Sequence, residues 1–289
     1  FFFTQTPPYA ILSGLVGSEM CIRDSITPST KGEVRDAVES ALDLMDGGVA
    51  RVAEKEGSGW KVNQWLKKAV LLSFRLNDME PMSGPANSPF WDKVPLKSMN
   101  WNADRFRQAG FRSVPGSVVR RSAYIAPGVI LMPSFVNRGA YVDSGTMVDT
   151  WATVGSCAQI GQNVHLSGGV GIGGVIEPPN AVPVMIGDDC LIGSRCIVAE
   201  GARVGDGVVL GAGSILTGSI PVIDADTGDE LGRGVVPSWC VAVQATRPKS
   251  FSGGEFGLPC ILVLKYLDPG ERHNKSALND VLRIHGVTT

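Results

Sequence analysis

The chain contains few of the residues from which metal centres and nucleic-acid interfaces are built. Its 289 residues include only three histidines, and its six cysteines form no Cys-x-x-Cys pair or other metal-type cluster. Lys and Arg total 26 against 28 Asp and Glu, so the formal charge of −2 leaves no basic excess for a nucleic-acid face. The apolar stretch between Ile11 and Ser25 is too short and interrupted to span a bilayer. These absences favour a soluble globular protein.

The strongest positive signal is a six-residue period between Tyr124 and Leu216. Every sixth residue from Ile130 to Ile172 is aliphatic, and a second run in a shifted phase extends from Ile186 to Leu216. A small or β-branched residue follows four positions after most of these aliphatics, and glycine often follows directly. This period indicates a parallel β-helix, in which each short strand buries one aliphatic and small residues fit the corners. A β-sandwich would instead alternate at period two.

The segments around the repeat have different periodicities. We predict a mainly β protein, with a left-handed parallel β-helix of hexapeptide repeats between a small α-rich N-terminal domain and a C-terminal β/α cap. The boundaries are 26–117 for the N-terminal domain, 118–218 for the β-helix and 219–289 for the cap. Expected elements are helices over 34–45, 64–76 and 103–109, a hairpin over 49–62, a loop over 77–97, strands over 240–243 and 260–264, and a closing helix over 276–284.

Residues 1–25 do not match the rest of the chain. They begin with three phenylalanines, have no basic region before the apolar stretch, and are similar to a translated sequencing-adapter tail. We therefore interpret residues 1–25 as a non-native gene-model artefact, with a targeting segment as the alternative. Cysteines within and after the repeat are expected to be small buried residues in a reducing cytoplasm, rather than catalytic thiols.

Proteins with this period are commonly trimeric acyltransferases, in which acyl-coenzyme A lies in the groove between two prisms; this is an analogy of fold alone. A hexapeptide carbonic anhydrase is excluded because it needs three zinc-binding histidines, and only His165 lies in the repeat. A sugar-nucleotide uridylyltransferase is also excluded, because residues 26–120 contain no Gly-rich nucleotide-binding domain.

One stretch of the repeat carries a family resemblance. Residues 141–174, with Met147-Val-Asp-Thr-Trp151 at their centre, resemble the tetrahydropyridine-2,6-dicarboxylate N-succinyltransferases. Segments 65–75, 92–95, 110–112 and 131–134 support the resemblance, which extends from about residue 26 to 284. It implies a cytoplasmic homotrimer that uses succinyl-CoA as co-substrate in lysine and diaminopimelate biosynthesis, with no metal and no permanently bound cofactor. The alternatives are a transferase using another donor, such as acetyl-CoA, and a non-catalytic solenoid scaffold.

The resemblance assigns three residues to the dicarboxylate substrate. Arg112, from the Gly-Phe-Arg motif, is expected to bind a substrate carboxylate, because a guanidinium pairs with a carboxylate in bidentate fashion. Asp149 is expected to hold the substrate amine, and Glu200 to act as general base or substrate contact. Which carboxylate takes the proton is left open, and solvated acids at corners are the structural alternative.

Further residues are candidates for contact with coenzyme A. Backbone N–H groups of Ser167, Gly168 and Gly169 are expected to stabilise the thioester oxyanion, although corner geometry explains these glycines equally well. His165 is a candidate for contact with coenzyme A or substrate.

Two features outside the regular repeat complete the expected site. Arg247 and Lys249 are expected to bind the phosphates of coenzyme A, with a solvated charge pair as the alternative. The excursion at Glu177–Ala181 breaks the period and is expected to form a loop that lines a pocket between chains.

Overall fold

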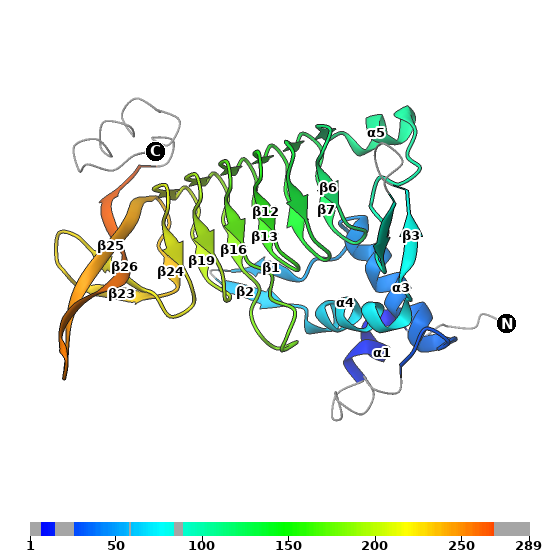
Figure 1. The fold of residues 1–289 in the computed structure, drawn as a ribbon, viewed down its shortest axis with the longest axis horizontal. Coiled ribbons are helices and arrows are strands. Elements are labelled where there is room, and N and C mark those ends of the chain that lie inside the picture. The colour runs from blue at the N-terminus through cyan, green and yellow to red at the C-terminus, as the bar shows by residue number, and fades with distance from the viewer. Residues whose placement is uncertain (1–6, 15–25, 58, 84–88, 269–289) are drawn as a thin grey trace.

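The computed structural model describes residues 7–14, 26–57, 59–83 and 89–268. Figure 1 shows a long prism of β coils, with helices and a small hairpin lying along one side and a long hairpin at the C-terminal end. The predicted parallel β-helix is therefore present, and its coils are built from two-residue strands paired in parallel. Within the described residues, no helix is long and apolar enough to cross a membrane.

The chain passes in turn through three sheets, which we call the first, second and third faces. The first face contains β7 (Tyr124–Ile125), β10 (Tyr141–Val142), β13 (Gln159–Ile160), β16 (Met185–Ile186), β19 (Arg203–Val204) and β24 (Val235–Val236). The second face contains β5 (Arg112–Ser113), β8 (Ile130–Leu131), β11 (Met147–Val148), β14 (His165–Leu166), β17 (Leu191–Ile192), β20 (Val209–Leu210) and β25 (Cys240–Phe251). The third face contains β6 (Val118–Val119), β9 (Phe135–Val136), β12 (Thr153–Val154), β15 (Gly171–Ile172), β18 (Ile197–Val198) and β21 (Ile215–Leu216).

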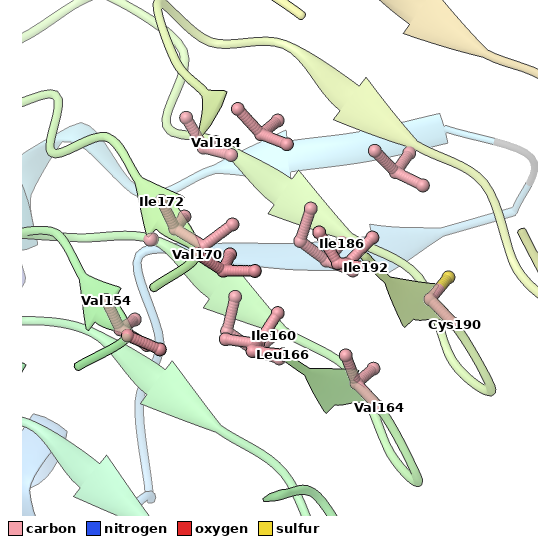
Figure 2. Close-up of a cluster of buried hydrophobic side chains, with 14 of the residues drawn as sticks. Val154, Ile160, Val164, Leu166, Val170, Ile172, Val184, Ile186, Cys190 and Ile192 are labelled. Atoms are coloured by element: carbon pink, nitrogen blue, oxygen red, sulfur yellow. The ribbon is translucent and has the colours of Figure 1, made fainter. Parts of the chain in front are cut away.

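The period-six aliphatics form the core of the prism, except at Ile130, which is only half-buried while the adjacent Leu131 points inward. Figure 2 shows Val154, Ile160 and Leu166 from three successive strands converging with the aliphatics of the next coil. All three side chains are fully buried. Each such burial stabilises the fold by about 1.5–3 kcal/mol, so every coil contributes to the stability of its neighbours. The hexapeptide period thus corresponds to one buried aliphatic per strand.

Glycine after an aliphatic has a specific cause at Gly161. The Asp188 side chain of the next coil accepts a hydrogen bond from the Gln162 N–H at 2.9 Å. A Cβ at Gly161 would lie 2.3 Å from Asp188 Oδ1, which is well inside van der Waals contact. Glycine is required here by the close approach of the next coil, in addition to any effect of backbone freedom.

Strand pairing extends beyond residues 118–218, the range predicted for the β-helix. Arg112 on β5 already pairs with Ile130, and after Leu216 the strands β24 and β25 continue the first and second faces. The period is hidden in the sequence because an antiparallel pair, β22 (Pro221–Asp224) and β23 (Glu230–Arg233), is inserted before β24.

The predicted helices and hairpin of the N-terminal part are confirmed. They are α3 (Glu33–Asp46), α4 (Gln64–Leu76), α5 (Ala103–Ala109), and the pair β1 (Ala53–Glu56) and β2 (Gly59–Val62). Helix α1 (Pro8–Gly14) buries Leu12 in the same core as α3 and α4. The predicted loop at 77–97 is partly wrong, because it contains an antiparallel pair, β3 (Glu80–Met82) and β4 (Phe90–Asp92). Three-residue strands are too short to produce a periodic signal.

The N-terminal part covers the first face through polar contacts. Arg51 lies over the Tyr141 ring at 3.8 Å and donates to Gln159 Oε1 at 2.9 Å. Lys55 pairs with Asp188 at 2.9 Å and Asp206 at 2.8 Å, farther along the prism. The N-terminal part therefore covers much of the first face, and among the described residues the second and third faces carry no such contacts from β1 and β2.

The C-terminal strands are much longer than the sequence suggested. β25 pairs in antiparallel fashion with β26 (Gly254–Tyr266), and β26 also pairs with β22. Only the inner ends of the hairpin, around 240–243 and 260–263, are largely buried, and the outer parts are exposed. The predictions recovered these buried ends because only they have continuous apolar runs. The closing helix predicted over 276–284 lies outside the described residues.

Candidate active site

Asp149 and His165 lie together at the corner between the second and third faces. Asp149 directly follows β11, and His165 lies on β14, which pairs with β11. The Thr150 N–H donates to Asp149 Oδ1 at 2.6 Å, and its hydroxyl lies 3.2 Å from the same oxygen. His165 Nε2 is 3.7 Å from Asp149 Oδ2. The local backbone thus fixes one carboxylate oxygen and leaves the other facing an imidazole.

These residues begin a groove of about 280 Å³ along the corner. Its small residues include Ser167, Gly193 and Gly211, which follow inward aliphatics of successive coils, and Leu191 and Val209 add apolar surface. The complete lining is Asp149, His165, Ser167, Leu191, Gly193, Ser194, Val209, Leu210 and Gly211. From β11, the second face continues through β14, β17 and β20 to β25, a distance of roughly 19 Å at ordinary strand spacing. A long, thin molecule could extend along this direction.

Arg112 is located on β5, the first strand of the second face, shortly after helix α5. It pairs with Ile130, which in turn pairs with Met147, so it lies two strands from β11. That separation is roughly 10 Å between backbones, and the Arg112 side chain is exposed. Arg112 and Asp149 are thus on the same side of the prism, within reach of one small molecule.

Glu200 lies at a different corner, between the third and first faces. It follows β18 and has a left-handed backbone, with φ of 54°. Together with Glu177, Arg203 and Arg233 it lines a cavity of about 750 Å³. Asp149 does not line this cavity. Within one chain, therefore, the two carboxylates assigned to the substrate do not face each other.

The Ser167–Gly169 segment offers fewer free donors than the sequence suggested. The Ser167 N–H donates to Ile192 O at 3.0 Å, and the Gly169 N–H donates to Thr150 O at 2.9 Å. Both bonds belong to the ladder of the prism. Only the Gly168 N–H of this segment has no partner among the described residues. Of the three predicted oxyanion donors, Gly168 is therefore the one that remains, and any other donor must come from outside the segment.

The basic pair on β25 lines a separate cavity of about 400 Å³. Arg247 Nη1 lies 3.1 Å from Glu230 Oε2, and Lys249 Nζ lies 5.6 Å from the Phe251 ring. Arg233 of β23 lines the same cavity and shares Glu230 with Arg247. Sequence reasoning missed Arg233. β23 lies in the same sheet as β25, with β22 and β26 between them, and this pairing between distant segments produces no local sequence pattern.

The excursion after β15 packs on the N-terminal part of its own chain. Lys67 Nζ of α4 donates to Pro178 O at 3.2 Å and also to Ala181 O. Glu177, Ala181 and Val182 then line the Glu200 cavity. The loop therefore lies against α4 and shapes this cavity; its predicted position between chains stays a prediction.

The described cysteines have the properties of buried small residues. Burial raises the pKa of Cys157 and of Cys240 to about 12, and that of Cys196 to about 11. Cys190 and Cys260 are also buried and unbridged. Because the thiolate is the nucleophile, thiols that stay protonated in this way are poor candidates for catalysis.

The repeat architecture and corner groove define a protein of the hexapeptide-repeat class. Residues 183–218 match the hexapeptide repeat of succinyl-transferase, and residues 20–76 match the tetrahydrodipicolinate N-succinyltransferase N-terminal family. A 2,3,4,5-tetrahydropyridine-2,6-dicarboxylate N-succinyltransferase from Nitrobacter winogradskyi is 55% identical, over 96% of this chain and 99% of its own length. The Agrobacterium fabrum protein of the same name is 59% identical, over 90% of this chain and 93% of its own length.

The chain therefore belongs to the tetrahydrodipicolinate N-succinyltransferase family, which confirms the resemblance found in the sequence. Among solved structures, a Campylobacter jejuni protein described as a 2,3,4,5-tetrahydropyridine-2-carboxylate N-succinyltransferase is similar, with 15% identity and a TM-score of 0.41. That match covers 81% of this chain and 63% of the other.

Proposed function

We propose that this chain transfers the succinyl group of succinyl-CoA to the amino nitrogen of ring-opened tetrahydrodipicolinate. The product is N-succinyl-2-amino-6-oxopimelate, an intermediate of lysine and diaminopimelate biosynthesis. The observation that carries the proposal is Asp149 at the end of the corner groove, in a chain 55% identical to a named N-succinyltransferase along nearly its whole length.

Arg112 and Asp149 bind the acceptor in this proposal. The Arg112 guanidinium pairs with one substrate carboxylate, and Asp149 holds the amine beside the thioester. The amine nitrogen forms a bond to the thioester carbonyl carbon, the C–S bond breaks, and coenzyme A leaves as the thiol after gaining a proton. The nitrogen loses one proton during this step, and Asp149 and Glu200 are the two candidate acceptors.

Succinyl-CoA lies along the groove as a co-substrate, and no metal or permanent cofactor takes part. The apolar wall at Leu191 and Val209 suits an extended thiol arm. The Gly168 N–H, next to the groove residue Ser167, is the candidate donor to the oxyanion. Arg247 and Lys249 bind phosphates at the far end, with Arg233 as a third cation of the same cavity. Phosphate groups favour such clusters of cationic donors.

The active assembly is a cytoplasmic homotrimer of left-handed prisms. The third face exposes Ile197 at 44% and Ile215 at 43%, and Trp151, beside Asp149, is 77% exposed. Large apolar side chains grouped on an uncovered face favour burial by a neighbouring copy. Packing a corner of one prism against the next would bring Asp149 of one copy near Glu200 of another, with the excursion after β15 in the pocket between them.

A thiol-release assay tests this function. Wild type and Asp149→Ala are compared with tetrahydrodipicolinate and either succinyl-CoA or acetyl-CoA. Asp143→Ala is the matched control, since Asp143 also follows an inward aliphatic but lies at another corner, 3.9 Å from Arg51. Turnover with succinyl-CoA that is lost only in the Asp149 variant supports the proposal.

Two other results of this assay would contradict the proposal. Turnover with acetyl-CoA but not with succinyl-CoA would indicate that acetyl-CoA is the acyl donor. Silence with both donors from a folded trimer would favour the scaffold alternative.

A further inference from the structure

Lys67 is a fully buried lysine that holds a loop of the Glu200 cavity. Its residue is 0% exposed, and its ammonium donates to Pro178 O and Ala181 O. We call residues 177–182 the pocket loop, because Glu177, Ala181 and Val182 line the cavity that contains Glu200. A lysine of helix α4 thus forms hydrogen bonds with the backbone of a loop that lines the cavity.

The surroundings of Lys67 are unusual for a buried lysine. Among the described residues, no carboxylate forms an ion pair with Lys67. Burial lowers its pKa, and the neighbouring Cys157 acts in the opposite direction. Lys97, whose side chain is only 6% exposed, has a carboxylate partner in Asp46 at 2.7 Å. Since a buried ammonium is costly without partners, the two loop carbonyls are the groups that compensate Lys67.

Lys67 is the side-chain donor to both carbonyls, and within the loop the Ala181 N–H also donates to Pro178 O at 2.9 Å. The pocket loop departs from the repeat and contributes no strand to the three faces. Backbone carbonyls can be held in place by a charged donor, and such hydrogen bonds are stronger than neutral ones. A neutral, apolar side chain at position 67 would leave both carbonyls without this donor and would free the loop to leave the cavity wall.

We propose that Lys67 is a positioning residue that fixes the pocket loop and thereby sets the affinity of the Glu200 cavity for the acceptor. This inference rests on the proposed function, in which Glu200 contacts the dicarboxylate substrate. It also gives helix α4 a role in catalysis, exerted through the loop and without any contact between Lys67 and substrate.

The first test is hydrogen exchange of the peptide that contains residues 173–186, in wild type and Lys67→Met. The loop amides of the variant exchange at least about tenfold faster, since the loss of a charge-assisted hydrogen bond corresponds to this factor or more. Lys97→Met is the matched control, because it removes a buried ammonium that does not contact the loop. The control should leave exchange over 173–186 unchanged even where it lowers overall stability.

The second test separates positioning from general destabilisation by steady-state kinetics. Lys67→Met should raise KM for tetrahydrodipicolinate about tenfold and leave KM for succinyl-CoA nearly unchanged. Lys67→Gln, which can still donate to one carbonyl, should give an intermediate value. Lys97→Met should leave both KM values at their wild-type level.

The possible results distinguish a failure of the Lys67 role from a failure of the proposed function. Unchanged loop exchange in Lys67→Met overturns the positioning role, whatever the kinetics. Equal rises of both KM values, or a similar rise in Lys97→Met, also overturn it, since they indicate general damage. Faster loop exchange in a protein whose wild type shows no turnover supports the loop anchor and overturns the proposed function.

Discussion

Mixing two inactive variants should restore activity if neighbouring copies share each site. Asp149 and Glu200 lie at different corners of one chain and line different cavities. A site that uses both must take Asp149 from one copy and Glu200 from the next. Homotrimers of Asp149→Ala or Glu200→Ala then contain no complete site. A mixed trimer has two copies of one variant and one copy of the other. In both cases one of its three sites is complete, because the cyclic arrangement brings one intact Asp149 beside one intact Glu200.

The expected magnitude follows from this count. Purified mixed trimers should show about one third of wild-type turnover, and a random equal mixture about one quarter. The chains are co-expressed with two different tags, mixed trimers are isolated by sequential affinity steps, and thiol release is measured with saturating substrates. The control pairs Asp149→Ala with the double variant Asp149→Ala/Glu200→Ala, a combination that cannot form a complete site.

Two results would refute this reasoning. Mixed trimers no more active than the single variants would show that the two carboxylates do not combine across copies. Full activity of the Glu200→Ala homotrimer would show that Glu200 is not needed, and complementation would then carry no information about the site.

Three further predictions concern packing, titration and phosphate binding. Gly161→Ala places a Cβ 2.3 Å from Asp188 Oδ1, so the free energy of unfolding should fall by about 1–3 kcal/mol, measured by urea denaturation with unchanged turnover at low temperature. The pKa of Cys157 and Cys240 is raised to about 12 by burial. The native state therefore holds these protons more tightly than the unfolded state, and the free energy of unfolding should fall as pH rises from about 9 towards 12; a thiol reagent at pH 8 should modify them only after denaturation. Arg247→Ala should raise KM for succinyl-CoA by about three- to tenfold with little effect on KM for the dicarboxylate, and an equal effect on both would contradict a phosphate role.

The parts of the fold that could be predicted are those with a repeated local cause. One buried aliphatic per strand, as at Leu166, produces period six, and apolar residues on one side of α3 and α4 produce a helical period. The same reasoning failed where pairing depends on distant partners. β24 resumes the first face only after an inserted antiparallel pair, and the exposed outer half of β25 is held by β26 alone.

The candidate site divides in the same way. Asp149 and Ser167 are both candidates from the sequence, and both line the groove. Lys67 reads as an ordinary charged residue of an amphipathic helix, and nothing local indicates that it is buried. Its role depends on two carbonyls more than a hundred positions away, which only the folded chain brings near.

The separation of Asp149 and Glu200 was nevertheless contained in the sequence. Paired residues such as Met147 and His165 lie 18 positions apart, one full coil of three faces. Gln159 and Met185 also pair, although 26 positions separate them, so the excursion adds eight residues to that coil. Once these eight are removed, the interval from Asp149 to Glu200 is two coils and seven residues, which places Glu200 one corner further round the prism. Because a rigid prism cannot fold its own corners together, a site using both residues has to be completed by a second copy.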